Sequence, residues 1–262
     1  MNKKAISETL VILLIFVVGA IILLFFGSAL AGQLKENADI DTCRLSVLAQ
    51  AQSRKIPGTD TSTPGTLIPL DCPRRILKIF EDKVNINGKN SKKYEFKKLT
   101  EEEINHILAE ELRLCWYKMA EGNRDIFEHS GLVGFDKTCL ICSEIEFDDK
   151  SRGKSFGGLL DYLKSKEVPK GTISYFDYLV RSQRTYYGWI GEVPWIQYSP
   201  FGYGTTERFS EDKVDTSQKY IIYFLAHKPN WLGQFPKMYT IAYYIGIGKE
   251  DKLKEECDTL VN

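Results

Sequence analysis

The first strong pattern along the chain is an uncharged, mostly apolar run between Thr9 and Ala31. About 20 consecutive apolar residues are enough to cross the ~30 Å hydrocarbon core of a membrane. We therefore expect residues 9–31 to form a transmembrane helix in contact with the lipid bilayer. Lys3 and Lys4 lie before this run, whereas Lys35 behind it is offset by acidic neighbours, so the basic bias places residues 1–8 in the cytoplasm.

This topology predicts a single-pass protein of the cell membrane whose large C-terminal part is extracytoplasmic. An alternative is a secretory signal that is cleaved at Ala29-Leu30-Ala31. Such signals usually have a shorter apolar region of roughly 7 to 15 residues, so we favour a retained anchor.

The residues Lys3-Lys4-Ala5-Ile6-Ser7-Glu8 resemble the N-terminal segment of archaeal type IV pilin-like proteins over about the first thirty residues. The resemblance implies that a peptidase cuts after Ala5 and that Glu8 helps subunits to register in a filament. It makes Lys4, Ala5, Ile6 and Glu8 the candidate processing and assembly residues, and it implies a homo-oligomer or filament built through the N-terminal helix. The alternative is that these residues are topology signals of an ordinary anchor.

The next segment predicts a stalk. Residues 34–54 contain neither glycine nor proline, which predicts that residues 32–55 continue the helix outward. Residues 56–66 are rich in threonine, proline and glycine and form the expected linker. The apolar face of this stalk helix comprises Ile40, Cys43, Val47 and Ala51.

Residues 67–262 are long enough for one extracytoplasmic domain with a sizeable core. Strands are predicted over residues 76–80, 83–86 and 93–96, with a hairpin turn at Asn87-Gly88, because Asn-Gly favours positive backbone angles.

A helix should follow, because Thr100 and Glu103 form a capping box and Gly122 provides a stop. Its apolar stripe comprises Ile104, Ile107, Leu108, Leu112, Trp116 and Met119.

The remaining pattern predicts strands over residues 138–147, 220–226 and 238–247, a short helix over 156–163 and a closing helix over 249–260. Strands and helices do not alternate regularly. The expected fold is therefore α+β: a long N-terminal transmembrane and stalk helix, then a mixed, mostly antiparallel sheet with flanking helices, supported by disulfides.

An even number of cysteines outside the membrane points to disulfide bonds, because oxidising compartments let them persist. In a regular strand Cys139 and Cys142 would face opposite sides and need different partners. We expect one of them to pair with Cys115 and the other with Cys72 or Cys257, while Cys43 ties the stalk to the domain. The six candidates are Cys43, Cys72, Cys115, Cys139, Cys142 and Cys257.

Cys139-Leu-Ile-Cys142 also permits a redox or metal interpretation. A zinc site needs further close ligands, yet no second such pair exists and the three histidines are scattered, so we expect no metal and no cofactor. Common catalytic motifs are absent from the sequence, which disfavours an enzyme.

Aromatic residues interleaved with glycine and proline make residues 186–203 a candidate binding loop for a surface protein or glycan. The alternative is that these rings fold back as a small core of their own. They are Tyr186, Tyr187, Trp189, Trp195, Tyr198, Phe201 and Tyr203.

Charge adds one exclusion. The chain has 35 basic and 35 acidic residues, and this balance argues against nucleic-acid binding.

We expect a membrane-anchored, structural or adhesive cell-surface protein, with a pilin-like filament subunit as one form of it. The alternatives are an extracytoplasmic subunit that binds a partner within a membrane complex and, third, an anchored thiol-dependent enzyme.

Overall fold

The computed structural model describes residues 39–52, 69–122, 136–181, 213–228 and 242–249, together with residues 253, 257 and 259–261. The predicted membrane span, its processing residues, the linker up to residue 68 and the aromatic loop lie outside this part. Within the described residues, no helix combines the length and apolar character needed to cross a membrane.

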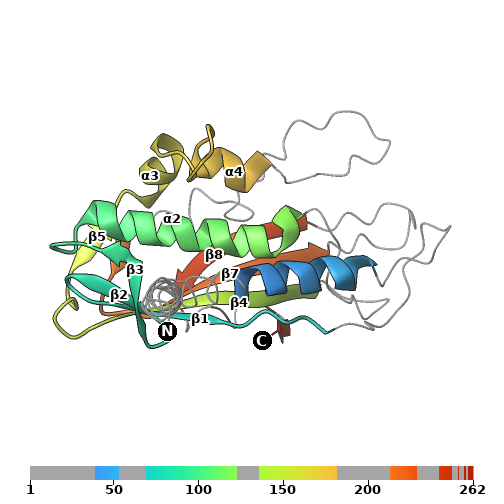
Figure 1. The fold of residues 1–262 in the computed structure, drawn as a ribbon, viewed down its shortest axis with the longest axis horizontal. Coiled ribbons are helices and arrows are strands. Elements are labelled where there is room, and N and C mark those ends of the chain that lie inside the picture. Colours follow the sequence, from blue (N-terminus) through green and yellow to red (C-terminus); the bar gives the residue numbers. More distant parts are fainter. Residues whose placement is uncertain are drawn as a thin grey trace, which may run out of the picture. The chain divides into compact units, whose positions relative to one another are not determined.

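A mixed sheet forms the centre of the fold (Figure 1). In the described part its strands follow the order β3-β2-β1-β4-β7-β8, and β9 also pairs with β4. All neighbours are antiparallel except the pairs β1–β4 and β4–β9. The predicted α+β fold with a mostly antiparallel sheet is therefore confirmed. The bounds are β1 (Arg75–Ile79), β2 (Lys83–Ile86), β3 (Lys89–Glu95), β4 (Asp136–Phe147), β7 (Tyr220–Lys228), β8 (Ala242–Lys249) and β9 (Thr259–Val261).

The hairpin between β2 and β3 turns where the sequence predicts it. Asn87 and Gly88 have positive φ angles of 51° and 78°, which an Asn-Gly pair adopts at little cost. The Asn87 side chain also accepts a hydrogen bond from the backbone N–H of Ile76 at 2.9 Å. The turn thus fixes β2 against β1 as well as against β3.

Helix α2 (Glu101–Lys118) begins as predicted, with Thr100 Oγ1 accepting the backbone N–H of Glu103 at 3.3 Å. The predicted apolar stripe is completely buried. The helix ends earlier than expected. Its last residue is Lys118, and the chain continues as a 3-10 turn, Ala120–Gly122. Residues 120, 121 and 122 all have positive φ, so the backbone has left the helical region before the glycine.

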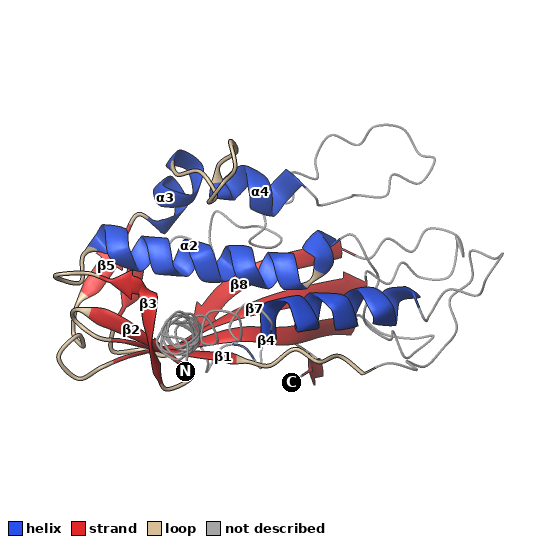
Figure 2. Ribbon diagram, in the orientation of Figure 1, coloured by secondary structure: helices blue, strands red, loops and turns tan. Residues whose placement is uncertain are grey.

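Helices cover one face of the sheet in two layers (Figure 2). Residues 39–52 are helical, and from Cys43 onward this helix shares the main core with α2 and the sheet. Helices α3 (Leu159–Ser165) and α4 (Tyr175–Arg181) pack on α2. The sequence predicts Phe156 and Leu163 in one helix, but Phe156 lies in β5 (Ser155–Gly157) because Gly158, in the left-handed region, separates strand from helix. Strand β5 pairs with β6 (Lys213–Asp215).

The opposite face carries a second, smaller core where Ile141, Ile221 and Tyr223 pack with Leu253 and the Cys139–Cys257 pair.

The prediction of one closing helix over residues 249–260 is wrong at both ends. Leu253 is helical, but residue 249 belongs to β8 and residues 259–261 form β9. Strand β9 pairs with residues 138–140 of β4, on a stretch of edge that β1 leaves open because β1 pairs only with residues 143–147. Backbone pairing at that edge outweighs the local helical pattern.

Strand β4 contains a bulge that the sequence does not announce. Its register against β7 shifts between Ile141 and Ser143, which leaves Cys142 without an opposite residue. A bulge of this kind turns two consecutive side chains toward the same face. Cys142 and Ser143 accordingly both meet α2, through a disulfide and a hydrogen bond respectively.

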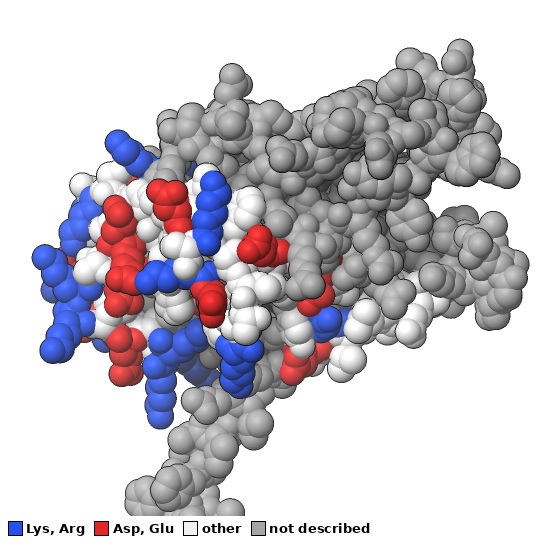
Figure 3. All heavy atoms as spheres, turned by 90° about the horizontal axis from the view of Figure 1, so that it is seen from above, with Lys and Arg blue, Asp and Glu red and all other residues white. Residues whose placement is uncertain are grey.

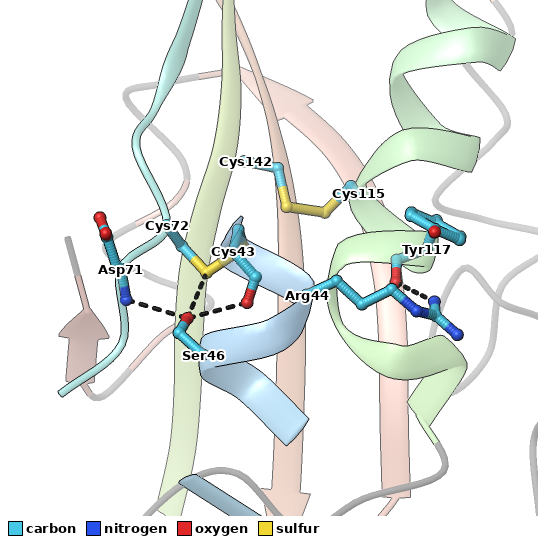
Figure 4. Close-up of a disulfide and its surroundings, with 8 residues drawn as sticks. All are labelled: Cys43, Arg44, Ser46, Asp71, Cys72, Cys115, Tyr117 and Cys142. Atoms are coloured by element: carbon cyan, nitrogen blue, oxygen red, sulfur yellow. Dashed lines mark hydrogen bonds between the residues drawn. A yellow bond between two sulfur atoms is a disulfide. The ribbon is translucent and has the colours of Figure 1, made fainter. Parts of the chain in front are cut away.

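All six cysteines are paired, as Cys43–Cys72, Cys115–Cys142 and Cys139–Cys257. This confirms that Cys139 and Cys142 have different partners and that Cys115 takes one of them. Between Cys72 and Cys257, which the sequence left open, Cys257 takes the other. Figure 4 shows the Cys115–Cys142 bond between α2 and β4 and, nearby, Cys43 and Cys72, which join the helix of residues 39–52 to the segment before β1.

Removing these bonds should destabilise the domain in order of loop length. Cys115→Ala/Cys142→Ala opens a link between residues 27 apart and should lower the free energy of unfolding by about 2–4 kcal/mol. Cys139→Ala/Cys257→Ala opens a link of 118 residues and should cost about 1 kcal/mol more, from the entropy of the longer loop. Urea titrations of both double variants measure this difference. Equal losses would contradict the entropic explanation.

Candidate functional site

The structure places the sequence-predicted site residues in two groups. The processing and assembly residues Lys4, Ala5, Ile6 and Glu8 and the aromatic loop between Tyr186 and Tyr203 lie outside the described residues. The six cysteines lie within the described residues, and all of them form disulfide bonds.

The redox alternative for Cys139 and Cys142 needs these two thiols to exchange a disulfide with each other. Instead they face opposite sides of β4, are at most 1% exposed, and bond to residues 257 and 115. Their environment is that of structural cysteines.

Sequence reasoning missed the polar residues with the most unusual environment, the neighbouring glutamates Glu110 and Glu111 of α2. Both are fully buried. The available signal was their position, since they interrupt the apolar half of α2 between Leu108 and Leu112. Charged residues are almost never fully buried unless they are paired, so each one requires a partner.

Glu111 joins α2 to the centre of the sheet. Its carboxylate accepts two hydrogen bonds from the guanidinium of Arg75, both at 3.1 Å, and one from Ser143 Oγ at 2.6 Å. Arg75 and Ser143 are opposite each other on β1 and β4. Burial alone would raise the pKa of Glu111, but these donors outweigh it and hold the pKa below its ordinary value.

Lys118 completes this cluster at the end of α2. It is 2% exposed. Burial lowers its pKa from 10.5 to about 8; Glu111 opposes this shift and Arg75 adds to it. Arg75 therefore bonds to the Glu111 carboxylate, and Lys118 interacts with it electrostatically, at the interface between helix and sheet.

Glu110 joins α2 to α4 and to the edge of the sheet. Arg113 donates two hydrogen bonds to its carboxylate, at 3.0 and 3.1 Å, and Lys93 of β3 forms an ion pair with it. The hydroxyl of Tyr175 in α4 donates to it at 2.5 Å. Burial would raise the pKa of Glu110, yet these partners lower it to about 2.

One turn earlier, His106 contacts α3. Its Nδ1 lies 3.0 Å from the hydroxyl of Tyr162, and its ring stands edge-on to Tyr94. Burial lowers the pKa of His106 against the attraction of Glu110, and burial together with nearby glutamates raises the pKa of Tyr162 to about 12. A hydroxyl with so high a pKa is a poor nucleophile near neutral pH.

Polar contacts attach the helix of residues 39–52 to α2 and to the segment before β1 (Figure 4). The Arg44 guanidinium donates to the backbone carbonyl of Tyr117, lies 4.0 Å from the centre of the Tyr117 ring and is 3.7 Å from the Glu121 carboxylate. Ser46 Oγ donates to the carbonyl of Cys43 and accepts the backbone N–H of Asp71. The Ser46 hydroxyl lies 4.0 Å from the Cys72 sulfur, beside the Cys43–Cys72 disulfide.

Searches against protein-family models, curated proteins and solved structures found no match to the chain. The described residues contain no group of three or more side chains suited to hold a metal ion. Seen from the side of α3 and α4, basic and acidic side chains are interspersed (Figure 3).

The buried charge clusters link helix α2 to the elements around it. Each buried carboxylate is bonded by a cation and a hydroxyl group from other elements, so each one fixes a position of α2 relative to its neighbours, and Arg113 of α2 itself adds a second cation at Glu110. The clusters and the disulfides therefore hold three layers in register.

Replacing Glu110 by glutamine should remove a stabilising charge. Because the pKa of Glu110 is lowered to about 2, its contribution is complete above pH 4.5 and is lost as the pH falls through 2. Glu110→Gln should therefore cost about 2–3 kcal/mol at pH 7 and progressively less below pH 4.5. Urea titrations from pH 7 to pH 2 measure this, with the exposed Glu167→Gln as control. A constant loss at every pH would contradict the assigned role.

Replacing Lys118 tests the opposite dependence of stability on pH. Between pH 8 and 10.5 the unfolded chain binds a proton at Lys118 that the folded chain has lost, so stability should rise with pH in this window. Lys118→Met should flatten this rise and stabilise the protein at pH 7 by roughly 1–3 kcal/mol. Titrations between pH 7 and about pH 9.5 stay below the ordinary ionisation of tyrosine. The exposed Lys164→Met should keep the rise, and an unchanged slope in Lys118→Met would refute the prediction.

Proposed function

We propose that the chain is a membrane-anchored cell-surface protein whose extracytoplasmic head has a structural or adhesive role. The observation that carries the proposal is that all six cysteines are bonded in three disulfides that join different elements. Such bonds persist in oxidising surroundings and are rare where glutathione and thioredoxin keep thiols reduced. An extracytoplasmic location supplies these surroundings.

The position of the Cys43–Cys72 bond supports a load-bearing head. It fastens the helix of residues 39–52 to the segment that leads into β1, next to the hydrogen bonds of Arg44 and Ser46. Val47 and Ala51 of the same helix are buried in the main core. If residues 9–31 form the anchor, this helix is the element through which the anchor holds the head.

The hexapeptide Lys3 to Glu8 extends the proposal to a pilin-like filament subunit, in which cleavage after Ala5 leaves a mature chain that begins at Ile6. In that form the N-terminal helices associate with one another while the heads face outward. An extracytoplasmic subunit that binds a partner and never polymerises would keep the same head and anchor.

Location and processing can be measured on the native protein. We expect the chain to fractionate with membranes, and alkylation without prior reduction should leave all six cysteines unlabelled. Mass spectrometry of the N-terminus should find Ile6 as the first residue.

Each other outcome changes the proposal in a defined way. Six alkylated cysteines in rapidly quenched cells would overturn the extracytoplasmic location. A retained Met1 or Asn2 would remove the filament form and leave a plain anchor. A start near Gly32 would remove the anchor. Ala5→Leu, which keeps the charges and the apolar run, should block processing without releasing the protein from the membrane.

A further inference from the structure

One hairpin of this neutral chain carries a local excess of positive charge. Residues 83–98 contain six lysines and one acidic residue, Glu95, which gives this segment a net charge of +5. The rest of the chain therefore carries −5. Because the molecule as a whole is neutral, attraction for an anion depends on this local excess.

Four of these lysines, which we call the lysine edge, are exposed and have no ion pair within the described part: Lys89, Lys92, Lys97 and Lys98. They lie along and just after β3, the last strand on one side of the sheet in the described order. Seven residues of β3 extend over roughly 23 Å at 3.3 Å per residue. The charges are thus spread along an edge strand and the residues that follow it.

Glu95 within the hairpin and Asp82 beside it are exposed carboxylates, whereas two other acidic neighbours are already engaged. Glu110 is buried and saturated by Arg113, Lys93 and Tyr175. Glu81 is paired with Lys154.

We propose that the lysine edge binds an acidic polysaccharide, a linear chain of sulfated or carboxylated sugars. This inference rests on the proposed adhesive function and names its partner. A series of flexible ammonium groups suits an extended polyanion, whose spaced charges each meet one lysine without demanding a fixed geometry. The exposed amide of Asn90, in the same strand, adds a hydrogen-bonding group for sugar hydroxyls.

The hairpin is poorly suited to the surface of an anionic membrane. Peripheral membrane binding combines basic residues with apolar side chains that enter the interface. The exposed large apolar residues of the described part are Leu45, Ile76 and Leu260, and of these only Ile76 adjoins the hairpin, through its backbone hydrogen bonds to Asn87. The apolar residues Val84, Ile86 and Tyr94 of the hairpin are buried in the core.

The test uses the full chain in detergent and immobilised heparin as the acidic polysaccharide. We expect binding that weakens as salt increases. The variant Lys89→Gln/Lys92→Gln/Lys97→Gln/Lys98→Gln should bind about tenfold more weakly or worse. A control with four other exposed lysines replaced, Lys150→Gln/Lys164→Gln/Lys170→Gln/Lys213→Gln, has the same net charge and should bind like the wild type.

Three results would overturn the inference: no binding of heparin by the wild type, equal losses in the two variants, or binding to phosphatidylglycerol vesicles in place of heparin. Light scattering tests one further explanation, that the lysines prevent the edge strand from pairing with the sheet of another molecule. A variant that aggregates while the wild type ignores heparin assigns them that role instead. Because purified protein binds regardless of its location in the cell, failure here leaves the proposed location intact, and failure of the location leaves heparin binding intact.

Discussion

The contact between α2 and the bulge of β4 is the constraint on which the rest of the domain depends. The bulge turns Cys142 and Ser143 toward the same face, where one forms the disulfide to Cys115 and the other donates to Glu111. Without the extra residue, one of these two side chains would face the far side of the sheet. The helix would then lose either its covalent link or a donor to a fully buried carboxylate, and an unsatisfied buried charge costs several kcal/mol.

This contact also determines how the outer layers are attached. Because Glu111 points to the sheet, its neighbour Glu110 is directed to the side, where it meets Lys93 of β3 and Tyr175 of α4. Two adjacent residues of one helix thus hold four other elements in place, β1, β4, β3 and α4. The helical rotation of about 100° per residue converts a pair of glutamates in sequence into bonds in two directions.

The sequence predicted the features that depend on local signals. The Asn87-Gly88 turn, the Thr100 cap and the stripe of α2 follow from backbone preference and periodicity, and the separate partners of Cys139 and Cys142 follow from strand alternation. The bulge, strand β9 and the partners of Glu110 and Glu111 depend on contacts between distant residues. Arg75 and Ser143, for example, meet only because β1 and β4 pair in parallel, and a parallel pairing has no local signature.

The three disulfides and the two charge clusters stabilise different parts of the domain, and the disulfides connect these parts to one another. The helix of residues 39–52 is bonded through Cys43 to the segment before β1, β1 pairs with β4, and β4 is bonded to α2 through Cys142 and to the C-terminal segment through Cys139. A force applied at that helix would reach the central strand through a covalent bond and a row of backbone hydrogen bonds. Since breaking any single noncovalent contact leaves this connection intact, the domain would keep its shape under such a force, which suits the structural or adhesive role proposed above.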